Sequence, residues 1–250
     1  MSEASNEQPI IQHLLELRTR ILHALLSVLI IFVVLFCFAN NIYEFVAQPL
    51  QQLLPEHSTM IATDVTSPFL TPFKLTLFVS LFLAMPFILY QVWAFIAPAL
   101  YKNEKRLALP LLASSVLLFY AGIAFAYYVV FPLVFQFFIS VAPQSIAAMP
   151  DISSYLSFVL KIIFAFGLAF EVPVVTVMLI AAGVVSPENL AKKRPYVVVG
   201  CFVLGMFLTP PDVISQVMLA LPMWLLFEFG LLFGRLFKQK QQSQDSINAE

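Results

Sequence analysis

Glu171 is the residue whose position most strongly suggests chemistry. It lies near the middle of the apolar run 155–182, which is long enough to cross a bilayer because about 20 apolar residues suffice. A carboxylate at that depth is costly, so it normally faces the protein interior or a water-filled cavity. Pro173 cannot donate to the carbonyl of Ala169, which frees a backbone acceptor close by. The pattern indicates a polar site within the membrane. A neutral Glu171 that hydrogen-bonds a neighbouring helix is the alternative.

Three further carboxylates, Glu16, Glu104 and Glu188, lie among basic residues. Each has a local explanation: Glu16 can pair with Arg20 at i,i+4, Glu104 with its basic neighbours, and Glu188 with the helix dipole after Ser186. For Glu188 this explanation is sufficient. Glu16 and Glu104 come from separate segments and could instead converge on two guanidinium groups, because arginine matches a carboxylate bidentately. That alternative predicts an acidic site for a basic peptide.

Motifs of soluble enzymes are missing from the sequence. It has no Gly-rich phosphate loop, no His and Cys set with metal-ligand spacing and no G-x-S-x-G. An intramembrane protease would need a nucleophile with a base or paired aspartates, and Glu171, Asp212 and Glu228 are not spaced as such a pair. Cys37 and Cys201 lie in apolar segments as packing residues. We therefore expect a protein that is not an enzyme, with no cofactor, no metal and no nucleic acid partner.

The composition is that of an integral membrane protein. Hydrophobic residues make up 61% of the 250 residues and charged residues 11%, whereas soluble proteins carry about 25% charged residues. The apolar runs predict one all-α membrane domain over residues 1–238 and a disordered polar tail over 239–250. Six transmembrane helices are expected, at about 21–39, 73–96, 107–131, 155–182, 196–208 and 213–233.

Several boundaries follow from local signals. Residues 1–12 should fray, a surface helix over 42–52 should break or kink at Pro49, and Thr71-Pro72 should begin the second span. Asp151 should cap the fourth span, and Ser186 should begin another helix. The fifth span is only about 20 Å long at 1.5 Å per residue, and the uninterrupted part of the sixth also looks short. Because the hydrocarbon core is about 30 Å thick, we expect the bilayer to be thinner near these two spans.

Orientation follows from the basic residues. Nearly all of the 13 Lys and Arg residues lie on four alternating connections: Arg18 and Arg20, Lys102, Lys105 and Arg106, Lys192, Lys193 and Arg194, and Arg235, Lys238 and Lys240. Cytoplasmic connections carry such an excess. Both termini are therefore predicted to be cytoplasmic, without a cleavable signal peptide.

Six segments of this chain carry long motifs: 13–20, 67–69, 90–106, 170–173, 193–196 and 208–212. These motifs resemble the TatC family, the core receptor of the twin-arginine protein translocase. The resemblance covers about residues 8–235, and six spans with a cytoplasmic N-terminus agree with it.

The resemblance implies a multi-pass protein of the bacterial inner membrane that binds twin-arginine signal peptides and helps to export folded proteins with the proton-motive force. It implies a periplasmic cap, a concave face, the single-span partners TatA and TatB, and several copies in a receptor complex within the lipid bilayer. Carried over residue by residue, the signal-binding positions are Glu16, Glu104, Arg18 and Phe95; the buried polar residue on the concave side is Glu171; the partner-binding positions are Met206 and Gln216; and further functional positions are Pro49 and Asp212.

A proton-coupled carrier of small solutes centred on Glu171 is the rival hypothesis. A carrier usually has internal repeats, paired broken helices and polar groups on several spans, whereas this sequence has no evident repeat and few intramembrane polar residues. Loss of Glu16 or Glu104 should abolish function in a translocase receptor and be tolerated in a carrier.

Overall fold

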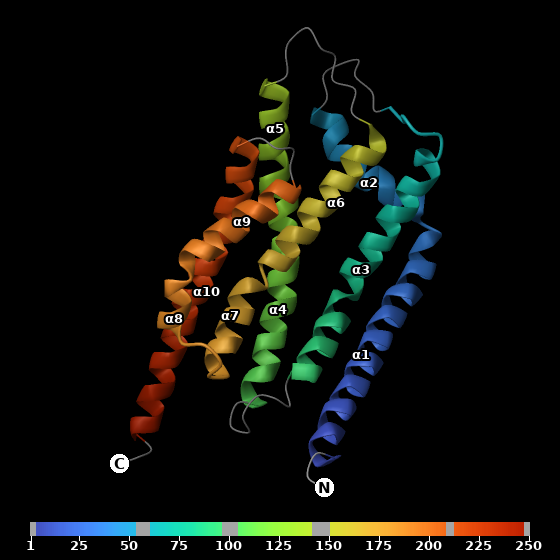
Figure 1. Ribbon diagram of the computed structural model, residues 1–250. Coiled ribbons are helices and arrows are strands. Elements are labelled where there is room, and N and C mark those ends of the chain that lie inside the picture. Colours follow the sequence, from blue (N-terminus) through green and yellow to red (C-terminus); the bar gives the residue numbers. More distant parts are fainter. Residues whose placement is uncertain (1–3, 54–60, 97–104, 142–150, 209–212, 248–250) are drawn as a thin grey trace. The chain divides into compact units, whose positions relative to one another are not determined.

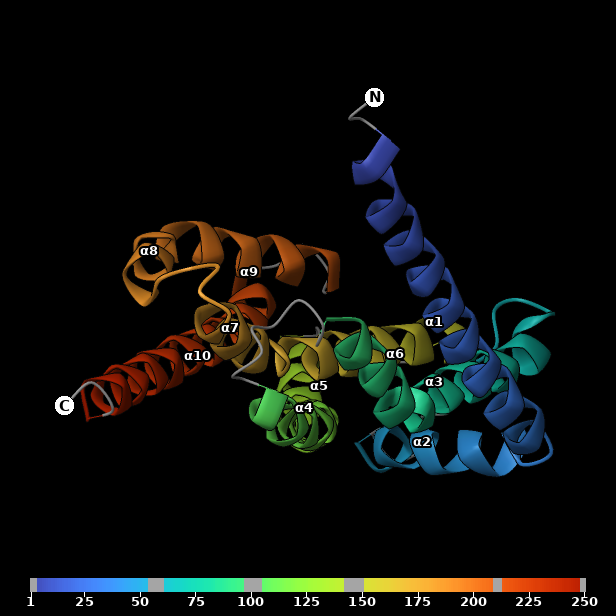
Figure 2. The same ribbon diagram turned by 90° about the horizontal axis from the view of Figure 1, so that it is seen from below.

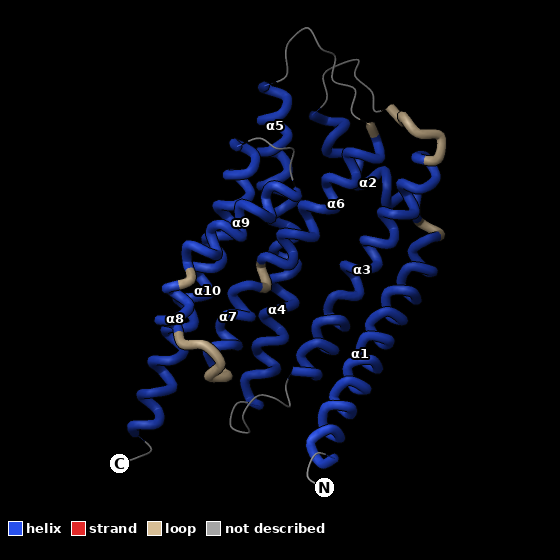
Figure 3. Tube along the Cα trace, viewed as in Figure 1, coloured by secondary structure: helices blue, strands red, loops and turns tan. Residues whose placement is uncertain are grey.

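In the computed structural model the protein is helical almost throughout (Figures 1 and 3). The structure describes residues 4–53, 61–96, 105–141, 151–208 and 213–247. Within these ranges the β-structure consists of one isolated parallel β-bridge, between Ile61 and Asp151. The chain divides into two compact units, one of Met1–Leu112 with Pro150–Leu156 and the other of Ala113–Met149 with Ser157–Glu250. That residues 1–238 form one domain stays a prediction.

The first unit is built on α1 (Ala4–Phe36), α2 (Ala39–Leu53) and α3 (Ser67–Ile96). Helix α1 runs alongside α3, and α2 turns back from the end of α1 and packs on α3 (Figures 1 and 2). Phe73 of α3 meets Phe32 and Phe36 of α1, with ring centroids 5.2 and 6.0 Å away. Most other apolar side chains of α1 are exposed, as expected for a helix whose outer face meets lipid.

Three predicted boundaries in this unit are wrong. The polar N-terminal segment is helical from Ala4, because adding residues to an existing helix costs far less than starting one. Helix α2 continues through Pro49 to Leu53, without the break that was the first of the two predicted effects of this proline. Helix α3 begins at Ser67, since Asp64 accepts a hydrogen bond from the Thr66 amide at 3.3 Å and Ser67-Pro68 supplies an equally good start.

The fourth span begins where the sequence predicts a cap. Asp151 Oδ2 accepts a hydrogen bond from the Ser154 amide at 2.9 Å, and Asp151 Oδ1 accepts from the Thr63 amide at 3.0 Å and from Thr63 Oγ1 at 2.9 Å. The Ile152 amide also donates to the Ile61 carbonyl at 2.9 Å. Residues 61–63 are thereby fastened to the start of the fourth span.

The third span, most of which belongs to the second unit, is continuous beyond its predicted end. Helix α4 (Lys105–Phe125) leads into a π-helical segment, Ala126–Val130, and then into α5 (Phe131–Val141). Pro132 cannot donate a backbone hydrogen bond, and the wider π turn directly before it accommodates that loss without ending the helix. The helix therefore extends past residue 131, the predicted end of the third span, as far as Val141.

The fourth span is split, contrary to the prediction of one helix over 155–182. Helix α6 (Ile152–Ala169) ends at Phe170–Glu171, and α7 (Val172–Ala181) begins there with Pro173 in its first turn. Because Pro173 has no amide hydrogen, the series of backbone hydrogen bonds along the helix is interrupted at this point. The Glu171 amide instead donates to the Leu168 carbonyl at 3.0 Å, in a tighter turn.

The last helices are α8 (Pro187–Lys192), α9 (Arg194–Leu208) and α10 (Val213–Ile247), and α10 packs against α7 and α9. Ser186 caps α8 as predicted, and its hydroxyl accepts from the Asn189 amide at 3.3 Å. The predicted disorder of residues 239–250 is wrong as far as Ile247, because α10 continues through the polar tail. The sixth span is also longer than predicted, because its apolar stretch covers Val213–Leu236 and α10 is continuous through Pro222 and Glu228.

Five helical stretches among the described residues are long and apolar enough to cross a membrane: Gln12–Phe36, Ser67–Ile96, Leu109–Phe138, Ile152–Ala181 and Val213–Leu236. The shorter apolar helix α9, with 15 residues, is the sixth predicted span. Hydrophobic length thus locates all six segments.

Close backbone contacts hold the second unit together. A Cβ atom on Gly122 of α4 would lie 2.6 Å from the Phe166 carbonyl oxygen of α6, and one on Gly230 of α10 would lie 2.8 Å from Pro173 Cα of α7. Only glycine permits such approaches, which are typical of helix pairs in membranes.

Candidate functional site

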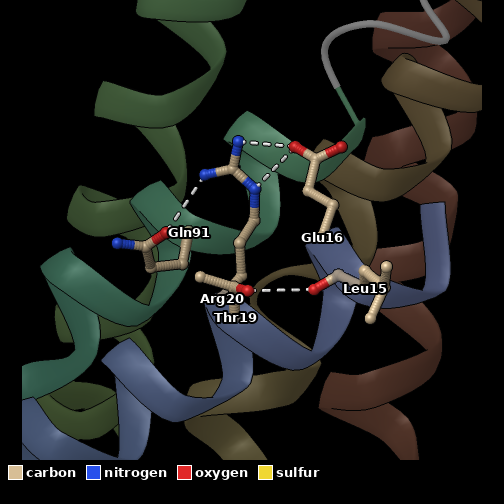
Figure 4. A network of polar contacts seen from close by, with 5 residues as sticks. All are labelled: Leu15, Glu16, Thr19, Arg20 and Gln91. Carbon is tan, nitrogen blue, oxygen red and sulfur yellow. Dashed lines mark hydrogen bonds and ion pairs between the residues drawn. The ribbon is translucent and has the colours of Figure 1, made fainter. Parts of the chain in front are cut away.

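The acidic site on the first unit is centred on Glu16 of α1 (Figure 4). Arg20, one turn later, donates from Nε and Nη2 to Glu16 Oε1 at 3.0 and 2.7 Å. Its remaining terminal nitrogen, Nη1, donates to Gln91 Oε1 of α3 at 3.1 Å. The local i,i+4 pair foreseen from the sequence is therefore present, and a buried amide of the neighbouring helix anchors it.

Burial differs along this chain of contacts. Gln91 is 8% exposed, whereas the side chains of Arg20 and Glu16 are 26% and 38% exposed. The Glu16 carboxylate is thus accessible, while its support reaches into the packed interface of α1 and α3. Within the described part of the chain, no hydrogen bond or ion pair reaches Glu16 Oε2, which points away from Arg20 in Figure 4. This oxygen can accept from a further donor.

Other predicted signal-binding residues lie on the same two helices. Arg18 is exposed on α1, and half-buried Phe95 stacks on His13, with ring centroids 4.2 Å apart and planes inclined by 17°. This contact, which the sequence analysis missed, joins the start of α1 to the end of α3. Glu104, the predicted partner of Glu16, and Asp212 lie outside the described residues. Pro49 lies within α2.

Glu171 occupies the break between α6 and α7 in the second unit. Its carboxyl forms a side-chain hydrogen bond with Ser115 of α4, while Oε1 is buried without a hydrogen-bond partner among the described residues. A buried carboxyl oxygen of this kind can take a proton or a donor from a ligand. Both sequence-based alternatives, a polar site and an interhelical hydrogen bond, therefore fit parts of the geometry.

Helices α9 and α10 carry the predicted partner-binding residues. Gln216 Nε2 of α10 donates to the Phe202 carbonyl of α9 at 2.8 Å, and Met206 is 51% exposed on α9. Gln216 therefore makes a hydrogen bond between the two helices. Between the two helices lies an apolar cavity of about 270 Å³, and its lining includes Val198, Cys201, Phe202, Val217 and Trp224.

An ion pair that sequence reasoning missed also joins these helices. Arg194 at the start of α9 donates from Nε and Nη2 to the two carboxylate oxygens of Glu228 on α10, both at 2.7 Å. The pair could have been predicted from the sequence, which has a basic residue at the edge of one span and an acidic residue within the next. Groups of three or more potential metal ligands are absent from the described residues.

A polytopic helical membrane protein, with an accessible carboxylate braced between its first two spans, is the class that this fold and site define. A family model described as Sec-independent protein translocase protein (TatC) matches residues 12–222. The chain belongs to the TatC family, which confirms the resemblance found in its motifs.

Relatives and solved structures agree with this assignment. The Sec-independent protein translocase protein TatC of Azotobacter chroococcum is 60% identical over 240 residues, covering 96% of this chain and 94% of the relative. That of Escherichia coli strain K12 is 59% identical over 238 residues, covering 95% and 92%. A crystal structure of the twin arginine translocase receptor TatC is 42% identical with a TM-score of 0.82, covering 90% of this chain and 98% of that one. The protein is therefore a multi-pass translocase component of the bacterial inner membrane.

Proposed function

We propose that this protein is the receptor subunit of a twin-arginine translocase and binds the arginine pair of export signals at Glu16. The observation that carries the proposal is the accessible Glu16 carboxylate, with one oxygen held by Arg20 and the other open to a further donor. A guanidinium group suits such an acceptor because its donors are planar and directed. Glu104 would supply the second carboxylate, and Arg18 and Phe95 would border the site.

The remaining predicted residues take separate roles in this proposal. The surface of α9 and α10 with Met206 and Gln216 would bind the single-span partners TatA and TatB, whose own helices could pack against the apolar cavity there. Glu171 would serve a later step of export, driven by the proton-motive force, within a complex that contains several receptor copies. The protein would supply binding and positioning, without enzymatic chemistry. Pro49 and Asp212 would have further functional roles.

Peptide binding by the purified protein in detergent tests the proposal. A twin-arginine signal peptide should bind more tightly than its twin-lysine counterpart, and Glu16→Gln should weaken the twin-arginine complex about 10- to 100-fold, because a hydrogen bond to a charged group contributes about 1.5–3 kcal/mol. Glu188→Gln is the matched control, since Glu188 is a carboxylate paired with Lys238 at 3.3 Å in the other unit.

Two results would contradict the proposal that this protein is a signal receptor. One is equal affinity for the arginine and lysine peptides, and the other is equal loss in Glu16→Gln and Glu188→Gln. Glu171, with its buried unpartnered oxygen beside a helix break, would then make the proton-coupled carrier the leading hypothesis.

A further inference from the structure

We propose that Gln91 and Arg20 are positioning residues, which hold the Glu16 carboxylate so that Oε1 is occupied and Oε2 faces the arriving signal arginine. This inference rests on the proposed function and assigns the basis on which the site distinguishes arginine from lysine. Neither residue belongs to the predicted signal-binding set, and Gln91 is 71 positions from Arg20 in the sequence.

The contact geometry gives the first argument. Arginine and carboxylate often pair through two parallel bonds, one to each oxygen. Here both donors of Arg20 converge on Oε1, at 3.0 and 2.7 Å, while Nη1 is bound to Gln91 at 3.1 Å (Figure 4). Pairs between exposed side chains one turn apart are weak on their own. The buried Gln91 amide therefore gives the Arg20 guanidinium a fixed position that a surface pair would lack.

The second argument concerns charge. A lone carboxylate attracts lysine and arginine alike, because attraction between charges carries little directional preference. Arg20 compensates much of the Glu16 charge, so an arriving cation gains less from charge alone. The remaining attraction comes from hydrogen bonds to the directed lone pairs of Oε2. A rigid guanidinium fork suits these lone pairs better than a rotating ammonium group does. The positioned pair should therefore favour arginine.

The same geometry argues against Arg20 as an internal competitor that the signal must displace. Displacement would be required if Arg20 covered both carboxylate oxygens. Within the described residues Arg20 contacts Oε1 alone, and a carboxylate can accept from several donors at once. The signal arginine can therefore bind beside Arg20.

The test measures the affinities of twin-arginine and twin-lysine peptides for the full-length protein and three variants in detergent. Gln91→Leu removes the anchor with little change in volume, and Arg20→Lys keeps the charge at an accessible position but loses the fork. Ser80→Ala is the matched control, because it removes another buried polar group of α3, whose hydroxyl, among the residues that the structure describes, bonds only the Thr76 carbonyl of its own helix at 2.7 Å. Thermal unfolding of each variant accompanies the binding data.

In Gln91→Leu and Arg20→Lys the twin-arginine peptide should bind about 5- to 10-fold more weakly, the effect of losing one ordinary hydrogen bond. The twin-lysine affinity should change less than twofold, so the ratio of the two affinities falls. Ser80→Ala should keep the wild-type ratio.

Two results would overturn the inference. One is an unchanged ratio of the two affinities, which includes the parallel loss of both that a merely structural role would cause. The other is tighter twin-arginine binding in Arg20→Lys, as expected of a competitor. If the wild-type protein does not prefer arginine, or Glu16→Gln has no effect, the proposed function itself fails. The preference of the wild-type protein and the affinity of Glu16→Gln therefore distinguish failure of the proposed function from failure of this inference.

Discussion

Replacing Gly122 with alanine tests how closely α4 approaches the end of α6. The new Cβ would lie 2.6 Å from the Phe166 carbonyl oxygen and 3.0 Å from Phe170 Cβ. Comfortable carbon–oxygen contacts are about 3.3 Å or longer, so the two helices would have to separate by roughly 0.7 Å. The obstacle is a backbone atom, which cannot turn aside as the end of a flexible side chain can.

The expected cost follows from two opposing terms. Overpacking a tight contact costs about 1–3 kcal/mol, whereas replacing glycine with alanine inside a helix returns about 0.5–1 kcal/mol. Gly200→Ala on α9 is the matched control, because no heavy atom of the described chain outside the adjoining turns of α9 lies within 4 Å of its new Cβ. The control should keep only the favourable term, so the two variants should differ by about 1–3 kcal/mol in unfolding free energy.

Thermal unfolding in detergent measures this difference. For a chain of this size about 1 kcal/mol corresponds to 2–4 °C, so Gly122→Ala should unfold roughly 2–12 °C below Gly200→Ala. Equal midpoints, or a higher midpoint for Gly122→Ala, would refute the close approach of α4 and α6. Because Phe170 directly precedes Glu171, the same shift should also disturb the hydrogen bond between Glu171 and Ser115.

Two further predictions concern charged contacts. Arg194→Gln and Glu228→Gln should each lower the unfolding midpoint, and the double variant should be no worse than either alone, since each single change already removes the pair; additive losses would show that the two side chains act independently. Hydrogen bonds from the backbone amides of Thr63 and Ser154 hold the pKa of Asp151 well below its ordinary value, so their contribution to stability is present above about pH 4 and is lost as the pH falls further. Hydrogen exchange at the Thr63 amide should accordingly lose protection at acidic pH in the wild-type protein and be weakly protected at every pH in Asp151→Ala, which has no side-chain acceptor; unchanged protection in that variant would contradict the prediction.

The six apolar segments could be predicted because the bilayer imposes a length on them that neighbouring helices do not alter. Helix boundaries at proline could not. Pro72, Pro86 and Pro222 lie inside continuous helices, whereas the chain breaks next to Pro173. A local rule treats these prolines alike. The backbone of α10 comes close to Pro173 at Gly230, a contact between helices that no local rule contains.

The contacts at the candidate sites likewise include some that could be predicted from the sequence and some that could not. The pair of Glu16 and Arg20 was predictable because residues four apart on a helix are neighbours. The bond from Arg20 to Gln91 and the pair of Arg194 with Glu228 span 71 and 34 positions, and only the packing of whole helices brings those side chains together. Residues that contact a ligand can thus be recognised from local motifs, whereas the residues that hold them in place require the fold.

The ion pair between α9 and α10 also indicates at which of its two ends α9 is too short to cross the hydrocarbon core. Helix α9 has 15 residues and is about 22 Å long, while the apolar part of α10, Val213–Leu236, has 24 residues and is about 36 Å long. Arg194, the first residue of α9, is tied to Glu228, which lies eight residues before Leu236 and therefore about 12 Å short of that end of the apolar stretch. The predicted thinning of the bilayer should consequently be concentrated at the Arg194 end of α9, the predicted cytoplasmic side, where Lys192 and Lys193 must reach water.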